Sequence, residues 1–448
     1  MSEKNRYRLQ TLLPAASIGL LTVAFTLAKT GRDALFFQGR GLLQLPMAYM
    51  GISLCSAPAA FVLVQAAKHW GNNACRVGIM LFTAVLLAVF APFLDQGNYS
   101  VMLSFFMLVP TLFGIIFATL WSQASDLFQN APETVSASSF SQITASALAG
   151  GMTGGFLAKG LISYLKPKWL ILVGAIAILI AAGVVIGTHR KFPMTIETKR
   201  THKDDLRSNF CGVFSQKYPR TLLFISMIGA VAGLLIDFQY YVLASNARMD
   251  SQGSARFFAN FYIIVNLSSL IFQLFLGPKI QDKFGLRGGL TILPLGILGG
   301  ATLSTAVASA LSRSVLKIAE GGLKSSFHRF IWEQAFIPVN SGERSSVKML
   351  VDGIGARIAE GMGASLLFLW LRRVDVADPA ALNTKWIAWT LLITVAVWLL
   401  LTRKLQLEIT RESCGGKPPM RASENSARAF TINAPALRNS EQETLKKG

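Results

Sequence analysis

Long apolar runs recur along this sequence, and they restrict the possible fold more than any other feature. A membrane-spanning helix needs about 20 largely apolar residues, and only helices and closed barrels satisfy every backbone polar group inside lipid. We therefore predict an all-α polytopic membrane protein with about twelve transmembrane helices. The predicted spans are Leu12–Phe37, Leu45–Ala67, Val77–Leu94, Val101–Trp121, Phe140–Ile162, Trp169–Thr188, Thr221–Leu243, Phe257–Leu276, Leu286–Leu311, Ser314–Phe336, Val347–Leu371 and Trp386–Thr402.

Composition and charge agree with a membrane protein. Hydrophobic residues make up 52% of the chain and charged residues only 15%, whereas a soluble chain carries about 25% charged residues. The net charge of +20 would suit a nucleic-acid partner, but the basic residues gather in the connections on one side of the membrane. Orientation alone explains that distribution. We expect the lipid bilayer as a partner and no nucleic acid.

The positive-inside rule gives the orientation. If the N-terminus is inside, the inner segments hold far more basic residues than the outer loops, so both termini are predicted to be cytoplasmic. The inner segments are the N-terminus, Arg190–Arg220, the chain from Arg403 onward, and the connections that contain Lys68, Arg76, Lys279, Lys283, Arg287 and Arg344. The run Leu12–Ala28 has no convincing small-residue cleavage site, so it is expected to remain as the first span.

A long polar segment after the sixth span divides the chain into two halves of six spans. The halves repeat weakly, since Trp70-Gly71 corresponds to Phe284-Gly285. This layout and the segment Asp-Lys-Phe-Gly-Leu-Arg at 282–287 resemble the major facilitator superfamily, whose halves rock around a central site. The predicted domains are a cytoplasmic N-terminus at 1–11, six-helix halves at 12–188 and 221–402, a cytoplasmic linker at 189–220, and a disordered cytoplasmic tail at 403–448.

Two of the spans, Ser314–Phe336 and Val347–Leu371, carry many ionisable residues. Such a group inside a membrane helix costs roughly 2.5–3.5 kcal/mol, so it is expected to face a partner or a water-filled cavity. We predict that these two helices form one wall of a polar pathway. Their charged residues are Lys317, Glu320, Lys324, His328, Arg329, Glu333, Lys348, Asp352, Arg357 and Glu360.

Several of these charges can pair within their own helix, because residues three or four positions apart lie on one face. A purely structural role therefore stays open for them. The excess of charge over what packing needs still favours a wet cavity. The pairs predicted by this spacing are Glu320 with Lys324, Arg329 with Glu333, Lys348 with Asp352, and Arg357 with Glu360.

Five further charged residues lie in other spans. Lys29 and Arg32, with Asp33 as a local partner, suit contact with an anionic solute, although long basic side chains near a helix end also snorkel to the interface. Asp126, at the inner end of its span, suits a coupling carboxylate or a loop-facing cap. Asp237 lies deep in the seventh span with no basic residue within a helical turn, so its partner must come from another helix, a transported cation or a proton.

No pattern in the sequence indicates an enzyme. We find no nucleophile triad, HExxH motif or phosphate loop in the required context, and Gly150, Gly151, Gly154 and Gly155 indicate close helix packing instead. Four histidines are scattered over the chain, and four cysteines lack metal-site spacing, so these thiols are expected to be reduced. We expect no enzymatic activity, no metal and no cofactor.

Several short segments carry a family resemblance. In the first half these are Arg32-Asp33 and the Ala-Ser-Asp motif ending at Asp126. In the second half they are Asp237-Phe238-Gln239-Tyr240, Phe257-Phe258-Ala259-Asn260-Phe261-Tyr262 with Asn266-Leu267, and Glu333-Gln334-Ala335-Phe336-Ile337-Pro338 followed by Lys348, Asp352-Gly353 and Arg357. Together they resemble the nucleotide transporter family, which contains the ATP/ADP translocases and their bacterial relatives.

The resemblance implies a major facilitator-like carrier that exchanges ATP for ADP or imports nucleotides across an inner membrane. It implicates residues of both halves, namely Arg32, Asp126, Asp237, Glu333, Asp352 and Arg357. The sequence also departs from the family. Trp332 stands where exchangers of the family usually have a lysine, and Glu360 lies near the position of a second lysine. Asp replaces Glu at positions 126 and 237. Losing two cations weakens the case for a polyphosphate, since each basic contact to phosphate is strong.

The sequence thus predicts a monomeric carrier that moves a small anionic solute, such as a nucleotide, by alternating access. Two alternatives stay open: a carrier of another metabolite or a drug, and a non-transporting scaffold whose basic linker or tail binds lipid or a partner. The predicted substrate-binding residues are Lys29, Arg32, Lys324, Arg329, Lys348 and Arg357. The predicted coupling or gating residues are Asp33, Asp126, Asp237, Glu320, Glu333 and Asp352.

Overall fold

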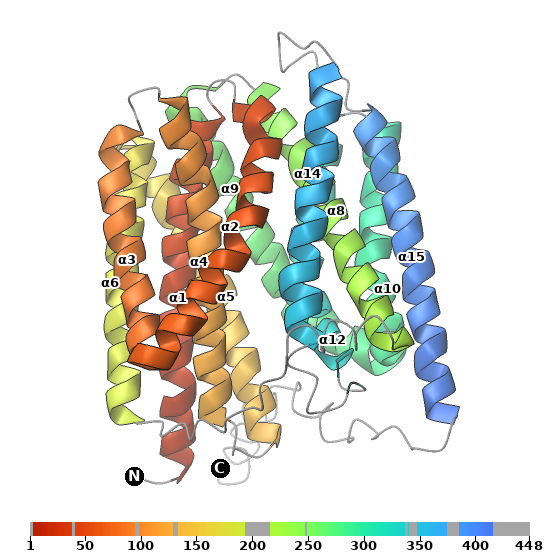
Figure 1. Cartoon of the computed structure of the whole chain (residues 1–448), viewed down its shortest axis with the longest axis horizontal. Helices are drawn as coiled ribbons and strands as arrows, with labels where there is room; N and C mark the ends of the chain where they lie inside the picture. The colour runs from red at the N-terminus through yellow and green to blue at the C-terminus, as the bar shows by residue number, and fades with distance from the viewer. Residues whose placement is uncertain are drawn as a thin grey trace, which may run out of the picture.

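The computed structural model describes residues 3–37, 41–94, 98–128, 133–192, 216–246, 249–307, 309–336, 339, 347–373 and 385–414, and every regular element within these ranges is helical. Two helical bundles stand side by side (Figure 1). The N-terminal bundle holds α1 (Glu3–Phe36), α2 (Gly41–Trp70), α3 (Asn72–Phe90) with the turn η1 (Ala91–Phe93), α4 (Tyr99–Phe128), α5 (Glu133–Ile162) and α6 (Pro167–Lys191).

The C-terminal bundle is built from helices that are less regular. It holds α8 (Lys217–Asn246), α9 (Ser251–Ile271), η2 (Phe272–Leu276), α10 (Gly277–Ala306), α11 (Ala310–Leu323), η3 (Lys324–His328), α12 (Arg329–Gln334), η4 (Met349–Gly355), α14 (Ala356–Arg373) and α15 (Lys385–Cys414). The segments η2, η3 and η4 are π-helical. They follow or precede α-helix without a break, so α11, η3 and α12 form one continuous span, as do η4 and α14.

Ten of the described helices are long and apolar enough to cross a membrane. Two further helical segments have the length but not the hydropathy, namely α5 and the continuous α11–η3–α12. The first is rich in Gly, Ser and Thr, and the second carries the charges that the sequence shows between Lys317 and Glu333. The chain is therefore a multi-pass helical membrane protein, and hydropathy alone misses the two spans that are least apolar.

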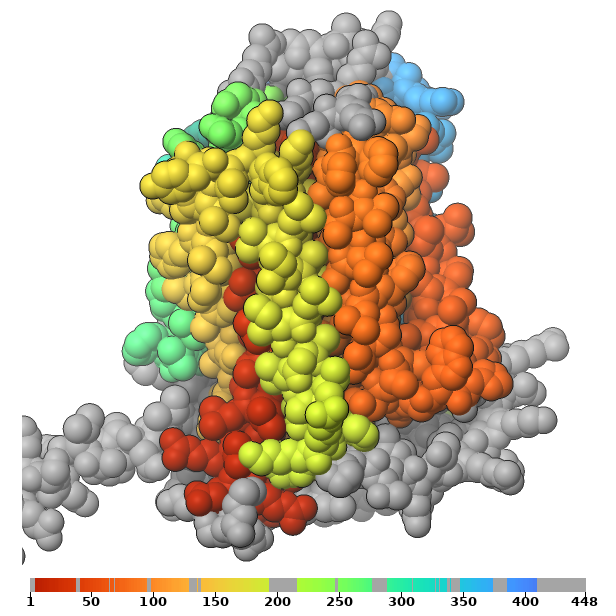
Figure 2. Space-filling model, turned by 90° about the vertical axis from the view of Figure 1, so that its left-hand side faces the viewer, coloured from red at the N-terminus to blue at the C-terminus, as the bar shows by residue number. Residues whose placement is uncertain are grey.

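The outer surface of the N-terminal bundle is apolar, as lipid contact requires. On α3, the side chains of Phe82, Val85 and Val89 are 55%, 61% and 56% exposed, and their spacing of three and four places them on one face. Figure 2 shows this side of the molecule, where α6 lies between α3 and α5 and covers much of α1. The face that a soluble protein would make polar is here a lipid-facing surface.

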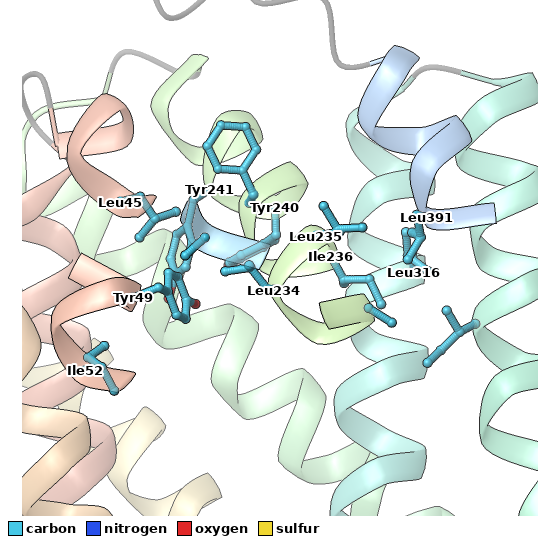
Figure 3. Packing of buried hydrophobic residues seen from close by; sticks show 14 of the residues in the cluster. Leu45, Tyr49, Ile52, Leu234, Leu235, Ile236, Tyr240, Tyr241, Leu316 and Leu391 are labelled. Carbon is cyan, nitrogen blue, oxygen red and sulfur yellow. The ribbon is translucent and has the colours of Figure 1, made fainter. Parts of the chain in front are cut away.

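Two apolar cores lie behind that surface. One belongs to the N-terminal bundle and gathers buried residues of α1, α3, α4 and α6. The other starts on α1 and α2 and continues through the C-terminal bundle, so it joins the two halves. Figure 3 shows part of this second core, where Leu45 and Tyr49 of α2 lie beside Tyr241 and Leu234 of α8.

The halves meet mainly where α5 packs on α9 and where α2 packs on α14. Glycines allow the first contact. A Cβ atom at Gly151 would lie 2.4 Å from the side-chain oxygen of Asn266 on α9, and one at Gly155 would lie 2.6 Å from a side-chain carbon of Ile263 on α9. Gly150 instead faces α1, where a Cβ atom would lie 2.2 Å from the carbonyl oxygen of Gly19. The prediction that the glycines of this span serve close helix packing is confirmed.

Local sequence explains several helix starts. Asp250 precedes α9 and its carboxylate accepts a hydrogen bond from the Gly253 amide at 2.9 Å, while Ser309 and Ser312 form a capping box at the start of α11. At the other end of the chain α15 continues to Cys414, beyond the span end predicted at Thr402. Residues 193–215 of the predicted linker and 415–448 of the predicted disordered tail lie outside the described residues.

Candidate functional site

An enclosed ion pair occupies the end of α1. Arg32 donates to one carboxylate oxygen of Asp33 through Nε at 2.7 Å and through a terminal nitrogen at 2.5 Å. Its guanidinium also lies 3.9 Å from the centre of the Phe106 ring. The two charged side chains are 4% and 0% exposed, so the pair is closed off from lipid and from water in this conformation. The predicted role of Asp33 as local partner of Arg32 is confirmed.

A second, more open set of charges lies on α8 and on α11–η3. Lys317 contacts Asp237 at 2.5 Å and Glu320 at 2.7 Å, and Lys324 contacts Glu320 from the other side at 3.1 Å. Asp237 is 26% exposed and Lys324 is 55% exposed. The prediction that Asp237 takes its partner from another helix is confirmed, as is the predicted Glu320–Lys324 pair.

Lys29 lies between these two sets of charges. Its ammonium is 4.6 Å from the ring centre of Tyr262 and 5.8 Å from that of Phe25, so aromatic faces surround it. It interacts electrostatically with charges of both sets, on α1, α8 and α11. Within the described ranges no carboxylate lies within ion-pair distance of it. We call the seven charged residues of this region the central cluster: Lys29, Arg32, Asp33, Asp237, Lys317, Glu320 and Lys324.

Tyrosines connect the central cluster across the two halves. Asp33 of α1 accepts hydrogen bonds from Tyr262 of α9 at 2.5 Å and from Tyr241 of α8 at 3.2 Å. In the opposite direction, Asp237 of α8 accepts a hydrogen bond from Tyr49 of α2 at 2.8 Å. The first helix of each half thus supplies an aspartate, and the second helix of the other half supplies a tyrosine to it. Sequence reasoning missed these tyrosines as site residues, although a phenol hydroxyl inside an apolar span needs a partner.

A further group of charges lies between η3 and α14, and we call it the C-terminal cluster: Arg329, Glu333, Lys348, Asp352, Arg357 and Glu360. Lys348 pairs with Glu333, and Arg357 pairs with Glu360 at 2.7 Å, as predicted for the latter. Arg329 lies over the ring of Trp121 on α4, 5.5 Å from its centre, and Ser53 of α2 donates to the Arg357 carbonyl oxygen at 2.5 Å. This cluster also faces the opposite half.

Two predicted intrahelical pairs are wrong. Lys348 contacts Glu333 of the neighbouring span rather than Asp352, and Asp352 accepts a hydrogen bond from the Trp332 indole at 2.8 Å. Arg329 lies over Trp121 and not beside Glu333. The π-helical turns give a physical reason for the pairing of Lys348, because the i, i+4 spacing does not align side chains in the wider π-helix. His328, predicted on the stripe of Lys317, stacks against Trp332 with ring centres 5.9 Å apart.

Asp126 lies apart from both clusters. It is near the end of α4, is partly exposed, and has Arg76 of α3 as its electrostatic neighbour. Arg76 is buried and donates to the Thr119 carbonyl oxygen at 3.1 Å. The structure therefore gathers eleven of the twelve predicted site residues into two clusters and leaves Asp126 outside them. In the residues that the structure describes, no group of three His, Cys, Asp or Glu side chains is arranged to hold a metal ion.

Comparisons with solved structures place this architecture among known folds. A mutant of the nucleoside transporter NupG superposes with a TM-score of 0.66 at 12% identity, covering 88% of this chain and 99% of that one. The POT family transporter PepTSo gives a TM-score of 0.62 at 11% identity, covering 89% and 98%. The E. coli fucose:proton symporter FucP gives 0.54 at 16% identity, covering 89% and 99%.

The chain has the major facilitator fold. The predicted fold class, an all-α membrane protein with two six-helix halves, is confirmed. No protein-family model matches the sequence, and no curated protein matches it either. The similarity to solved structures at these identities concerns the fold, so the roles predicted for individual site residues stay predictions.

Proposed function

We propose that this protein is a membrane carrier that works by alternating access and moves a small solute that is anionic at least in part. We place it in the cell inner membrane as a monomer with both termini in the cytoplasm. The substrate would lie between the halves at the central cluster, and the C-terminal cluster would line the route to it. The fold supports a carrier, since halves that rock around a central site are its general mode of action.

One observation carries the proposal: charged side chains of both clusters make contacts across the boundary between the halves. Asp237 bonds with Tyr49, and Arg329 lies over Trp121, each pair crossing that boundary. The side chain of Lys324 remains 55% exposed although it lies in a membrane span. An exposed charge at that depth requires water rather than hydrocarbon around it, which supports a hydrated chamber.

The contacts suggest how the predicted roles divide. Lys29 and Arg329 are the predicted substrate-binding cations that lack a carboxylate partner within the described ranges, so they suit direct contact with an anion. Arg32, Lys324, Lys348 and Arg357 are already paired with carboxylates. These four would reach the substrate only after their partners move, which joins binding to the coupling or gating role proposed for the carboxylates.

A nucleotide is the finer substrate assignment. The resemblance of short segments to nucleotide transporters supports it, and NupG, a fold relative, is a nucleoside transporter. Two positions weigh against a polyphosphate. Trp332 stands where exchangers of that family have a lysine, and its indole donates a hydrogen bond to Asp352 instead of adding a positive charge. Glu360 forms an ion pair with Arg357, so this arginine is not free to bind a phosphate. These contacts favour a solute with fewer negative charges than ATP.

A second candidate is a carrier of an uncharged or zwitterionic solute. The internal pairing of most charges favours it, because paired side chains neutralise one another without a bound anion. The third reading, a scaffold, depends on the linker and the tail, most of which lie outside the described residues. Deleting residues 415–448 separates it from a carrier, since a carrier keeps its flux.

The test is uptake into proteoliposomes after a thermal-shift screen of purified protein against nucleotides, phosphorylated metabolites, organic acids and nucleosides. A bound compound raises apparent stability by mass action. We expect at least one anionic compound to stabilise the protein and to be taken up. Arg357→Ala should abolish that uptake while expression is kept, and Arg372→Ala, at the end of α14, is the matched control. Uptake of uncharged compounds alone would favour the second candidate.

A further inference from the structure

The central cluster contains one more positive than negative group. Its cations are Lys29, Arg32, Lys317 and Lys324, and its carboxylates are Asp33, Asp237 and Glu320, with His328 counted as neutral. Each carboxylate has a cation within 3.1 Å. The neighbouring pair of Arg357 and Glu360 adds no net charge. The excess is therefore one unit, and contacts assign it to one side chain.

That side chain is Lys29. Arg32 is committed to Asp33, while Lys317 and Lys324 share Asp237 and Glu320 between them. Among the described residues, Lys29 contacts the faces of Tyr262 and Phe25 and no carboxylate, and its side chain is partly exposed. A cation over aromatic rings gains about 0.5–2 kcal/mol, but the rings supply no counter-charge. In the state without solute, the cluster is left with a positive charge that its own residues do not neutralise.

We infer that the central cluster selects a solute with a single negative charge and holds that charge on the Lys29 ammonium. This inference rests on the proposed carrier function and specifies the charge class of its substrate. A monoanion makes the cluster neutral. An uncharged solute leaves Lys29 without a counter-ion, and a solute with two or more negative charges requires cations that are already paired.

Binding a solute with two or more negative charges has a free-energy cost, and specific ion pairs of the cluster account for it. To offer a second cation, the cluster must release Lys317 or Lys324 from Glu320, whose side chain is 5% exposed, or release Arg32 from the fully enclosed Asp33. Releasing one of the lysines leaves Asp237 and Glu320 with a single cation between them. Releasing Arg32 leaves Asp33 without its partner, and breaking a buried ion pair costs about 3–5 kcal/mol. Carboxylates and phosphodiesters are the chemical classes with one charge. A nucleotide would fit this count only as a singly charged phosphodiester, and a polyphosphate would not fit it.

Two matched probe series test this at neutral pH on purified, detergent-solubilised protein. Benzamide, benzoate and phthalate carry zero, one and two negative charges on one ring, and adenosine, its 3′,5′-cyclic monophosphate and its 5′-monophosphate do so on a larger frame. We expect the monoanion of at least one series to bind at least about tenfold more tightly than its neutral and dianionic members, measured by thermal shift and calorimetry. Failure of both monoanions to bind folded protein overturns the inference.

Variants should move the charge preference in opposite directions. Lys29→Met removes the excess charge, so the neutral member should become the best ligand, and Lys29→Arg should restore the monoanion. Asp237→Asn removes one of the two carboxylates that Lys317 contacts and raises the net charge of the cluster by one, so it should move the preference toward the dianion. Arg372→Met removes a cation outside the cluster and should change nothing. A monoanion preference that survives Lys29→Met in folded protein overturns the assignment.

Flux of the same probes into proteoliposomes separates this inference from the proposed function. Binding in the expected charge order without any flux supports the charge class and contradicts the carrier. Flux with a preference for neutral or dianionic members supports the carrier and overturns the charge class. The charge preference of each variant is measured by ligand binding and not by transport. A variant that loses transport for another reason therefore still tests the charge preference.

Discussion

The two halves use charge in different ways. In the N-terminal half, Arg32 and Asp33 are sequence neighbours on a regular helix, pair with each other and are enclosed. In the C-terminal half, Asp237 is 26% exposed and takes Lys317 from another helix. The π-helical segments η3 and η4 carry Lys324 and Asp352, whereas the described part of the N-terminal half has no π-helical segment.

This difference teaches where rearrangement is to be expected. A pair between adjacent residues of one helix keeps its geometry however the bundles move. Pairs between α8 and α11, or between α12 and Lys348, depend on the relative positions of whole helices. π-Helical turns in membrane helices are frequent at functional sites, because they loosen the regular backbone bonding. The N-terminal half presents a fixed charge pair, and the C-terminal half presents the charges whose partners can change.

The largest effect should come from Arg32→Met. It leaves the fully enclosed Asp33 carboxylate without its cation, so we expect the free energy of unfolding to fall by about 3–5 kcal/mol. Thermal melting and the yield of monodisperse protein in detergent measure the loss. The double variant Arg32→Met/Asp33→Leu removes both charges and should recover much of it. If Arg32→Met were as stable as the wild type, the enclosed ion pair would not stabilise the N-terminal half, and the difference drawn between the halves would be wrong.

Lys317→Met should have a smaller effect on stability and a larger one on transport. The Asp237 carboxylate is reached by water and Glu320 keeps Lys324, so we expect a loss of about 2–3 kcal/mol in the free energy of unfolding. Uptake should fall to about a tenth or less, since Asp237 and Glu320, the carboxylates predicted to take part in coupling, lose their shared cation. Melting curves and initial uptake rates, corrected for the amount of folded protein, give the two values. Equal stability losses for Lys317→Met and Arg32→Met would contradict the comparison.

The tyrosine hydrogen bonds test the same difference between the enclosed Asp33 and the hydrated Asp237, with smaller expected losses of stability. Tyr262→Phe removes a donor from an enclosed carboxylate, and Tyr49→Phe removes one from a carboxylate that water can reach. We expect losses of about 1.5 kcal/mol for the first and about 0.5–1 kcal/mol for the second. Tyr164→Phe is the control, because that side chain is 89% exposed. The reverse order of the two losses would show that Asp237 is the less hydrated acid.

The smallest effect should come from Lys348→Gln. The side chains of Lys348 and Glu333 are 40% and 45% exposed, and exposed ion pairs contribute about 0–1 kcal/mol. Melting temperature should therefore stay within a few degrees of the wild type, whereas initial uptake rates should decrease because a predicted substrate contact is lost. A large loss of stability would show that the Lys348–Glu333 pair resembles the enclosed Arg32–Asp33 pair and not the exposed charge pairs of the C-terminal half.

The sequence predicts the fold well because membrane spans are recognised by length and hydropathy, and two halves of six spans follow from one polar interruption. It also predicts that Asp237 needs a distant partner, since an acid with no base within a helical turn must find one elsewhere. It does not reveal the π-helical turns, because they depend on tertiary packing and not on a local pattern. For that reason the i, i+4 rule pairs Lys348 with Asp352, while the structure pairs Lys348 with Glu333. Tyr49, Tyr241 and Tyr262 were missed because a tyrosine in an apolar span resembles ordinary core.

The glycines of α5 have a mechanical consequence. Gly150 and Gly154 let the backbone of α1 approach on one side, and Gly151 and Gly155 let α9 approach on the other. At the α9 contact, the side chains of Asn266 and Ile263 lie directly on the backbone of Gly151 and Gly155, which have no side chains of their own to resist a change of crossing angle. We expect the two bundles to turn about the α5–α9 contact, and any bulky residue introduced there to fix the angle between them.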